Sequence, residues 1–282
     1  MTLSRRRFVL AAPVSCAALL AALFQAGVHD SRPGPGAFVL HAQQPATAES
    51  VARQIQDRNT GRDSQSSMRM KLYDRHNRVR ERALAIVSLR GREAPGAAPT
   101  APDGDRLLIR FNYPNDIRGT GFLVWEHPKV DDERFLYLPS LGRVRRIAGA
   151  ETQESFVGSD FTYAFAGPDP PWTAPAGGPP RDAWRLESRR KDASAEFPRV
   201  VSIVLKDSFV VVGAEVYNRR NEKQKIYTVR RLQQIEGIWT IMESEMTDAV
   251  AKTRTELVVE ATDYNVGLKE SDFSRRELER VK

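Results

Sequence analysis

Cysteine is almost absent from this sequence, since Cys16 is the only one in 282 residues. It lies in an N-terminal apolar segment, so the chain beyond that segment has no thiol. Disulfides, thiolate nucleophiles, iron–sulfur clusters and zinc–thiolate sites are therefore excluded there. A lipid-modified cysteine usually follows an aliphatic residue three positions earlier, and Pro13 occupies that position, which disfavours a lipoprotein.

Histidine is scarce as well, and beyond residue 42 only His76 and His127 remain. Both lie in polar, turn-forming strings, and no Gly-x-Ser-x-Gly elbow is present to complete a Ser–His–Asp triad. Gly119-Thr120-Gly121 lacks the third glycine of a phosphate loop and precedes a strand. The consecutive acids Asp131-Asp132-Glu133 are typical of a solvated loop. We therefore expect no metal, no cofactor and no enzymatic activity.

One catalytic alternative stays open. The chain holds 36 acidic residues, so some carboxylates must lie close together, as a glycosidase requires. A hydrolase of this kind predicts at least one Asp or Glu buried in a cleft with a raised pKa.

The N-terminus has the order of a secretory signal, with basic Met1–Arg7 before an apolar stretch from Phe8 to Val28. The string from Ser4 to Leu10 resembles the twin-arginine export signature, an address read by a receptor. We predict a signal peptide over residues 1–42, cleaved after Ala42, and a periplasmic protein. The alternative is an uncleaved anchor, since a stretch of about 20 apolar residues can cross a bilayer.

Excess charge is small once this segment is set aside. The whole chain has a formal charge of +7, and residues 43–282 carry +4. So weak an excess predicts no nucleic-acid partner. Basic strings at Arg143–Arg146 and Arg189–Lys191 suit anionic lipid headgroups or an acidic protein, or serve to discourage pairing at strand edges.

The spacing of apolar residues predicts one helix followed by many strands. The helix covers 47–58, with Thr47 as its N-cap. Alternation and turn residues predict strands over 68–73, 79–89, 106–113, 119–126, 134–138, 143–147, 184–189, 200–205, 209–218, 223–235, 238–247 and 253–262. A Pro- and Gly-rich loop occupies 167–180, and a short helix begins at Ser271. We expect one domain over 43–282, an antiparallel meander with one or two helices against one face.

Two of these strands are apolar on both faces. Phe122-Leu123-Val124-Trp125 and Phe135-Leu136-Tyr137-Leu138 lack the alternation of a sheet with one face in water. They need cover on both sides. Either the sheet lines an apolar cavity, or ordinary core packing covers both of its faces.

Several strings, in order, are similar to those of a known family. They are Asn59–Asp63, Tyr113–Gly121, Phe135–Pro139, Arg143–Ile147, Ser155–Tyr163, Gly237–Thr240, Glu245–Thr247, Tyr264–Val266 and Phe273–Leu278. Together they resemble the LolA-like outer-membrane lipoprotein-sorting proteins, in a branch known only as uncharacterised periplasmic proteins. The sequence departs from that pattern after Tyr163, where Ala164-Phe165 and the Pro- and Gly-rich segment replace the usual acidic pair.

The resemblance implies a mainly β fold with a few helices, an incomplete antiparallel β-barrel wrapped around helices. It implies a monomeric periplasmic carrier or chaperone that holds a lipid or lipoprotein acyl chains in an apolar cavity, with an RND-type inner-membrane transporter as partner. The alternative is a non-catalytic accessory subunit docked to such a transporter. The expected cavity residues are Phe111, Phe122, Val124, Trp125, Phe135, Tyr137 and Trp239, and the expected mouth residues are Phe156, Phe161 and Tyr163.

Overall fold

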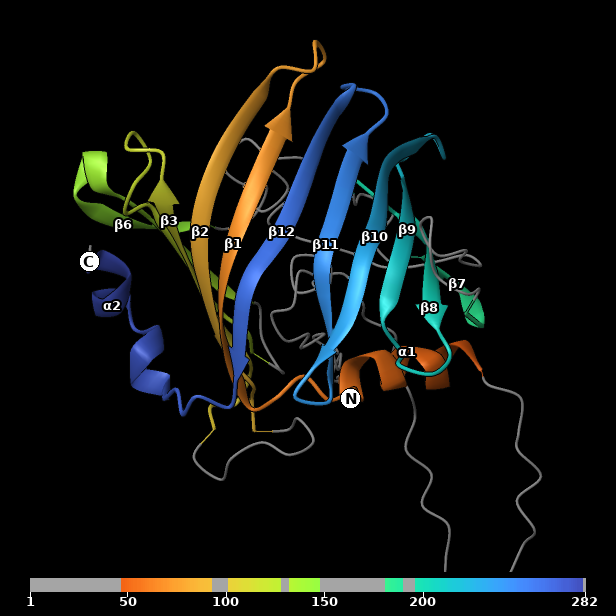
Figure 1. Ribbon diagram of the computed structural model, residues 1–282, viewed down its shortest axis with the longest axis horizontal. Coiled ribbons are helices and arrows are strands. Elements are labelled where there is room, and N and C mark those ends of the chain that lie inside the picture. Colours follow the sequence, from red (N-terminus) through yellow and green to blue (C-terminus); the bar gives the residue numbers. More distant parts are fainter. Residues whose placement is uncertain (1–46, 93–100, 128–131, 148–180, 190–195, 281–282) are drawn as a thin grey trace, which may run out of the picture.

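The computed structural model describes residues 47–92, 101–127, 132–147, 181–189 and 196–280. In these ranges the chain forms one antiparallel sheet with α-helices at its margins (Figure 1). The strands are β1 (Asp63–Tyr73), β2 (Val79–Leu89), β3 (Arg106–Tyr113), β4 (Gly121–Trp125), β5 (Glu133–Leu138), β6 (Arg143–Ile147), β7 (Ala183–Arg189), β8 (Arg199–Leu205), β9 (Val211–Tyr217), β10 (Lys223–Ile235), β11 (Ile238–Asp248) and β12 (Thr253–Tyr264). The helices are α1 (Ala48–Asp57) and α2 (Arg275–Glu279), with short 3₁₀ turns η2 (Pro139–Leu141) and η5 (Glu270–Phe273).

All predicted strands are present, and their ends shift by a few residues. The largest shift is in β1, which begins at Asp63 rather than at Met68. Its first half carries serines where the second half carries methionine and leucine, so hydrophobic alternation does not reveal it. Hydrogen bonds take the place of apolar packing there, because Ser64 bonds Ser88 at 2.8 Å and Ser66 bonds Thr262.

The sheet is an incomplete barrel, as expected. Its strand order is β6-β5-β4-β3-β2-β1-β12-β11-β10-β9-β8-β7. β1 pairs with β12, so the first and last strands meet in the middle of the sheet. β6 and β7 follow one another in sequence but form its two opposite edges, which leaves the barrel open between them.

The two faces of the sheet differ. One face carries Met68, Met70, Phe111 and Phe122, and we call it the inner face. The opposite face, which we call the outer face, carries Leu108, Leu123 and Phe135. On the central strands the outer face is charged, with ion pairs such as Arg69–Glu260 at 2.6 Å and Arg231–Glu243 at 2.8 Å. These strands therefore show the clean alternation of a sheet with one face in water.

On β3–β6 the outer face is apolar and is covered by the C-terminal segment. η5 and α2 lie against these strands, with Phe273 and Leu278 fully buried. Ser274 separates the two short helices and caps α2, its Oγ accepting from the amide of Glu277 at 3.2 Å. The doubly apolar strands β4 and β5 thus have protein cover on their outer side, and their inner residues join the main core.

Helix α1 packs at the other end of the sheet. Thr47 is its N-cap, with the hydroxyl accepting from the amide of Ser50 at 3.1 Å, as predicted. Its buried Val51 contacts a small cluster with Leu186 of β7 and Val204 of β8. Among the residues described, no helix combines the length and apolarity that crossing a bilayer requires.

Candidate functional site

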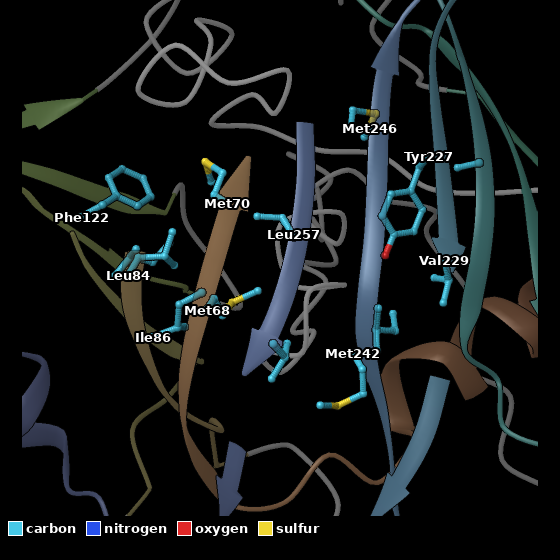
Figure 2. Close-up of a cluster of buried hydrophobic side chains, with 14 of the residues drawn as sticks. Met68, Met70, Leu84, Ile86, Phe122, Tyr227, Val229, Met242, Met246 and Leu257 are labelled. Atoms are coloured by element: carbon cyan, nitrogen blue, oxygen red, sulfur yellow. The ribbon is translucent and has the colours of Figure 1, made fainter. Parts of the chain in front are cut away.

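The inner face carries a continuous apolar cluster that runs from β6 to β8. Its centre lies on β1, β12, β11 and β10, where side chains from neighbouring strands point to the same side (Figure 2). The strand register explains this, because Met70 lies opposite Leu257 on β12, and Met246 lies opposite Tyr227 on β10. Each of these residues has at most 1% of its surface exposed.

Methionine is concentrated on this face. Apart from Met1, every methionine of the chain belongs to the inner cluster: Met68, Met70, Met242 and Met246. Methionine is unbranched and polarisable, so a surface built from it can adapt to different apolar shapes. Sequence analysis recognised Met68 and Met70 as alternating strand residues but did not select them as site residues. The sequence did contain a signal, because all the methionines after Met1 fall in two of the predicted strands, 68–73 and 238–247.

The structure divides the residues predicted to line a cavity. Phe111, Phe122 and Val124 belong to the inner cluster, and half-buried Trp239 packs against it. Arg82 lies over the Phe111 ring, with its guanidinium carbon 5.7 Å from the ring centre. These four residues therefore share one surface with the methionines.

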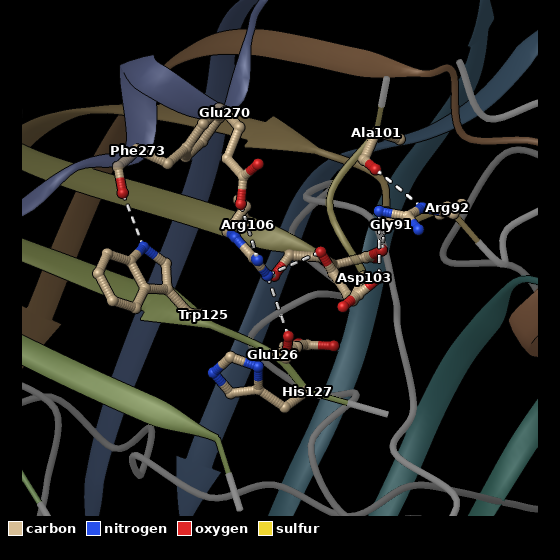
Figure 3. A network of polar contacts seen from close by, with 12 residues as sticks. Gly91, Arg92, Ala101, Asp103, Arg106, Trp125, Glu126, His127, Glu270 and Phe273 are labelled. Atoms are coloured by element: carbon tan, nitrogen blue, oxygen red, sulfur yellow. Dashed lines mark hydrogen bonds and ion pairs between the residues drawn. The ribbon is translucent and has the colours of Figure 1, made fainter. Parts of the chain in front are cut away.

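The other three lie on the outer face. Trp125, Phe135 and Tyr137 belong to the cluster that the C-terminal segment covers. The Trp125 and Phe135 rings meet edge to face at 5.0 Å, and the Trp125 indole donates to the Phe273 carbonyl at 2.7 Å (Figure 3). This division follows from strand geometry, because adjacent residues of a strand point to opposite faces of the sheet. The predicted mouth residues Phe156, Phe161 and Tyr163, and the loop 167–180, lie outside the described residues.

Toward the end where α1 terminates, the inner side of the sheet becomes polar. Buried hydroxyls replace the apolar side chains there, and Thr240 Oγ1 lies 2.8 Å from the Tyr264 hydroxyl. Arg58, just after α1, donates from Nη1 to the Trp239 carbonyl at 3.5 Å. Burial lowers the pKa of Arg58 to about 10, and the nearby guanidinium of Arg90 adds to this effect. We call this region the polar foot of the inner face.

Two acids have carboxyl oxygens shielded from solvent, buried Asp105, which lies near Arg90, and half-buried Glu126. Burial raises the pKa of Asp105, and it raises that of Glu126 well above 4.5, with repulsion from Asp105 as a second cause. The Glu126 backbone carbonyl accepts from Arg106 at 3.0 Å (Figure 3), whereas its Oε2 is shielded from solvent without a hydrogen-bond partner. The hydrolase alternative predicted such an acid. Because this oxygen is enclosed by protein, the geometry favours a structural role for Glu126 over contact with a substrate.

The two histidines lie apart from one another. His76 is exposed in the β1–β2 turn, and His127 follows β4, with Nε2 3.5 Å from a Glu133 oxygen. Within the ranges that the structure covers, no three His, Cys, Asp or Glu side chains are grouped so that they could hold a metal ion.

Comparisons with known proteins agree on the fold. A family model described as an uncharacterised protein matches residues 103–165 and 178–280. A candidate outer-membrane lipoprotein-sorting domain from Vibrio parahaemolyticus is 27% identical, with a TM-score of 0.71 over 83% of this chain and 100% of that one. A DUF1329 family protein from Desulfovibrio piger is 25% identical, with a TM-score of 0.70 over 82% of this chain and 97% of that one.

A LolA superfamily protein from Nitrosomonas europaea shares the fold at 16% identity, with a TM-score of 0.58 over 83% of this chain and 100% of that one. No curated protein sequence matches the chain. The open antiparallel barrel and these neighbours together place the fold in the lipoprotein-sorting, carrier type. The chain therefore belongs to the family whose model is described as an uncharacterised protein, and its fold is similar to that of LolA-like outer-membrane lipoprotein-sorting domains.

Proposed function

We propose that this protein is a non-catalytic carrier that holds the acyl chains of a lipid or lipoprotein against its inner face. The observation that carries the proposal is the concentration of the methionines beyond Met1 in one inner apolar cluster. The similarity to a candidate lipoprotein-sorting domain from Vibrio parahaemolyticus supports the same reading.

The physical requirement on such a carrier is simple. An acyl chain in water loses about 0.8 kcal/mol of stabilisation per exposed CH₂ group, so transfer across an aqueous space needs an apolar surface that shields the whole chain. The surface needs no directional chemistry, but it must accept chains of different length and curvature. Flexible methionine side chains, together with Leu84, Leu257 and Phe122, provide that kind of surface.

The direct test is mass spectrometry of organic extracts from natively purified protein, followed by titration with a fluorescent fatty acid. We expect bound lipid and saturable uptake. Met70→Gln places an amide in the inner cluster and should weaken uptake strongly, whereas Lys71→Gln, the next residue on the opposite face, should leave uptake unchanged. Circular dichroism verifies that both variants fold. Repeated recovery of protein without lipid, combined with no uptake by the unaltered chain, would refute the carrier function.

We further propose that the protein works as a monomer in the periplasm and exchanges its ligand with an RND-type transporter. The N-terminal export signature supports the location. Strand β6 supports docking, because it is an edge strand with exposed Arg143, Arg145 and Arg146. Site-specific crosslinking from Leu141, an exposed residue beside β6, tests the contact. Crosslinking to a transporter by a protein that binds no lipid would instead favour the accessory-subunit alternative.

A further inference from the structure

The polar foot contains a half-buried cation, Arg58, that has no acid partner among the residues that the structure describes. Arg58 makes one long hydrogen bond, from Nη1 to the Trp239 carbonyl at 3.5 Å, and forms no ion pair with any residue in the described part of the chain. A guanidinium that is partly removed from water is stabilised by an acid nearby, because desolvation of a charge is costly unless an opposite charge compensates. The guanidinium group is planar and rigid, so it is suited to bidentate hydrogen bonding with a carboxylate or a phosphate.

The neighbouring cation, Arg90, caps the C-terminal end of α1, which Arg58 does not. Arg90 is 4% exposed and donates to the carbonyls of Gln56 at 3.1 Å and of Arg58 at 3.0 Å, which lie at the C-terminal end of α1. A cation is favourable at that end of a helix and satisfies its free carbonyls. The side-chain nitrogens of Arg90 are thus directed at the helix, whereas those of Arg58 are not required for capping.

The nearby acids do not neutralise both cations. Asp105 and Asp57 both favour the charged form of Arg90, and burial favours the neutral form of the Glu126 carboxyl. Among the described residues, neither Asp105 nor Glu126 forms an ion pair with Arg58, and neither is among the charges that shift its pKa. Within the described part of the chain, Arg58 therefore has no acid of its own at the foot of the inner face.

The polar foot adjoins the apolar cluster on the same strands. On β11, buried Thr240 lies beside the carbonyl that Arg58 contacts, and Met242 and Met246, farther along the same strand, belong to the apolar cluster. On β12, buried Tyr264 lies at the foot and Leu257 in the apolar cluster. The inner face therefore has an amphipathic order along the strands, with a cation at one end and hydrocarbon beyond it.

We propose that Arg58 binds the oxyanion head of the acyl ligand, a carboxylate or a phosphate, while the chain extends along the methionines. The inference rests on the proposed carrier function and deepens it, because it identifies the ligand as a single-headed anionic amphiphile bound head first at the polar foot.

Calorimetric titration with three ligands of equal chain length tests this: dodecanoate, dodecyl phosphate and dodecanol. We expect the two anions to bind about tenfold or more tightly than dodecanol, the discrimination that one charge-assisted pair supplies. Arg58→Met should abolish the difference and leave dodecanol affinity unchanged. Arg53→Met, which removes an exposed arginine from α1, is the matched control and should change nothing. The relative affinities of the two anions show whether carboxylate or phosphate is preferred.

Each contrary result has a distinct meaning. Equal affinity of the unaltered protein for all three ligands would overturn the Arg58 site while the carrier function stands, and this comparison needs no variant. Inorganic phosphate binding as tightly as dodecyl phosphate would also overturn the inference, because the chain would then contribute nothing. No binding of any amphiphile would refute the carrier function and the inference together.

Discussion

The C-terminal segment makes a contact whose energetic consequence can be tested closely. Leu278 of α2 is fully buried over Gly121 at the start of β4. A methyl group added at Gly121 would lie 2.5 Å from Leu278 Cδ1, so the two positions compete for the same space. We therefore expect Gly121→Ala and Leu278→Ala each to destabilise the protein, and the double variant to lose less than the sum.

The magnitudes follow from the packing. Leu278→Ala removes a fully buried side chain and should cost about 2–5 kcal/mol, toward the lower value because a short terminal helix can settle into the space. Gly121→Ala overpacks the site and should cost about 1–3 kcal/mol. In the double variant the new methyl occupies part of the vacated volume, which gives a favourable coupling of roughly 1–2 kcal/mol.

Urea unfolding followed by tryptophan fluorescence measures all four proteins. Gly213→Ala is the matched control, because its new methyl on β9 would lie 2.9 Å from Ile203 Cδ1 on β8, far from Leu278. The stability losses of Gly213→Ala and Leu278→Ala should therefore sum in the double variant to within about 0.5 kcal/mol. Strict additivity of Gly121→Ala with Leu278→Ala would show that α2 does not pack on β4 as described. Fatty-acid uptake per folded molecule should be unchanged in the Gly121 and Leu278 variants, because this contact is on the outer face.

Three further outcomes are expected. Replacement of the four inner methionines by leucine should preserve the fold, since each exchange costs less than about 1.5 kcal/mol, but should narrow the range of chain lengths bound in a titration series. Glu126→Gln should stabilise the protein at neutral pH by about 1–3 kcal/mol. The pKa of Glu126 is raised in the folded protein, so the free energy of unfolding should fall as pH rises above about 4.5. Urea denaturation at a series of pH values should show a smaller fall for Glu126→Gln than for the unaltered protein. An identical pH profile for the two proteins would contradict the raised pKa of Glu126. Thr47→Ala should cost about 1 kcal/mol by removing the N-cap of α1, whereas Thr47→Ser should be nearly neutral in the same assay.

Local sequence was sufficient for the succession of elements. Alternation and turn residues predicted the strands of a continuous meander, and the Glu236-Gly237 turn between β10 and β11 shows why, since both residues have the positive φ that a two-residue hairpin turn requires. The first half of β1 was missed because its inward-facing positions are serine, which form hydrogen bonds to the two neighbouring strands, β2 and β12.

The candidate site was only partly predictable. Alternation separates the residues of β4 into two sets, Phe122 with Val124 and Leu123 with Trp125, but a strand apolar on both sides does not reveal which set faces inward. That choice depends on the C-terminal segment, which covers one face from more than 130 positions away in sequence. The pairing of Arg58 with the foot of β11 was equally hidden, because 181 positions separate Arg58 from Trp239.

The sequence by itself determined the kind of fold, the poverty of thiol and imidazole chemistry, and the residues that must avoid water, because each depends on side-chain type and on the period of a single strand. Only the tertiary structure decided which apolar residues share a surface, where the methionines gather, and which arginine has no acid partner among the described residues. Those outcomes depend on strand register and on segments that pack across the sheet, and neither is encoded by the spacing of neighbouring residues.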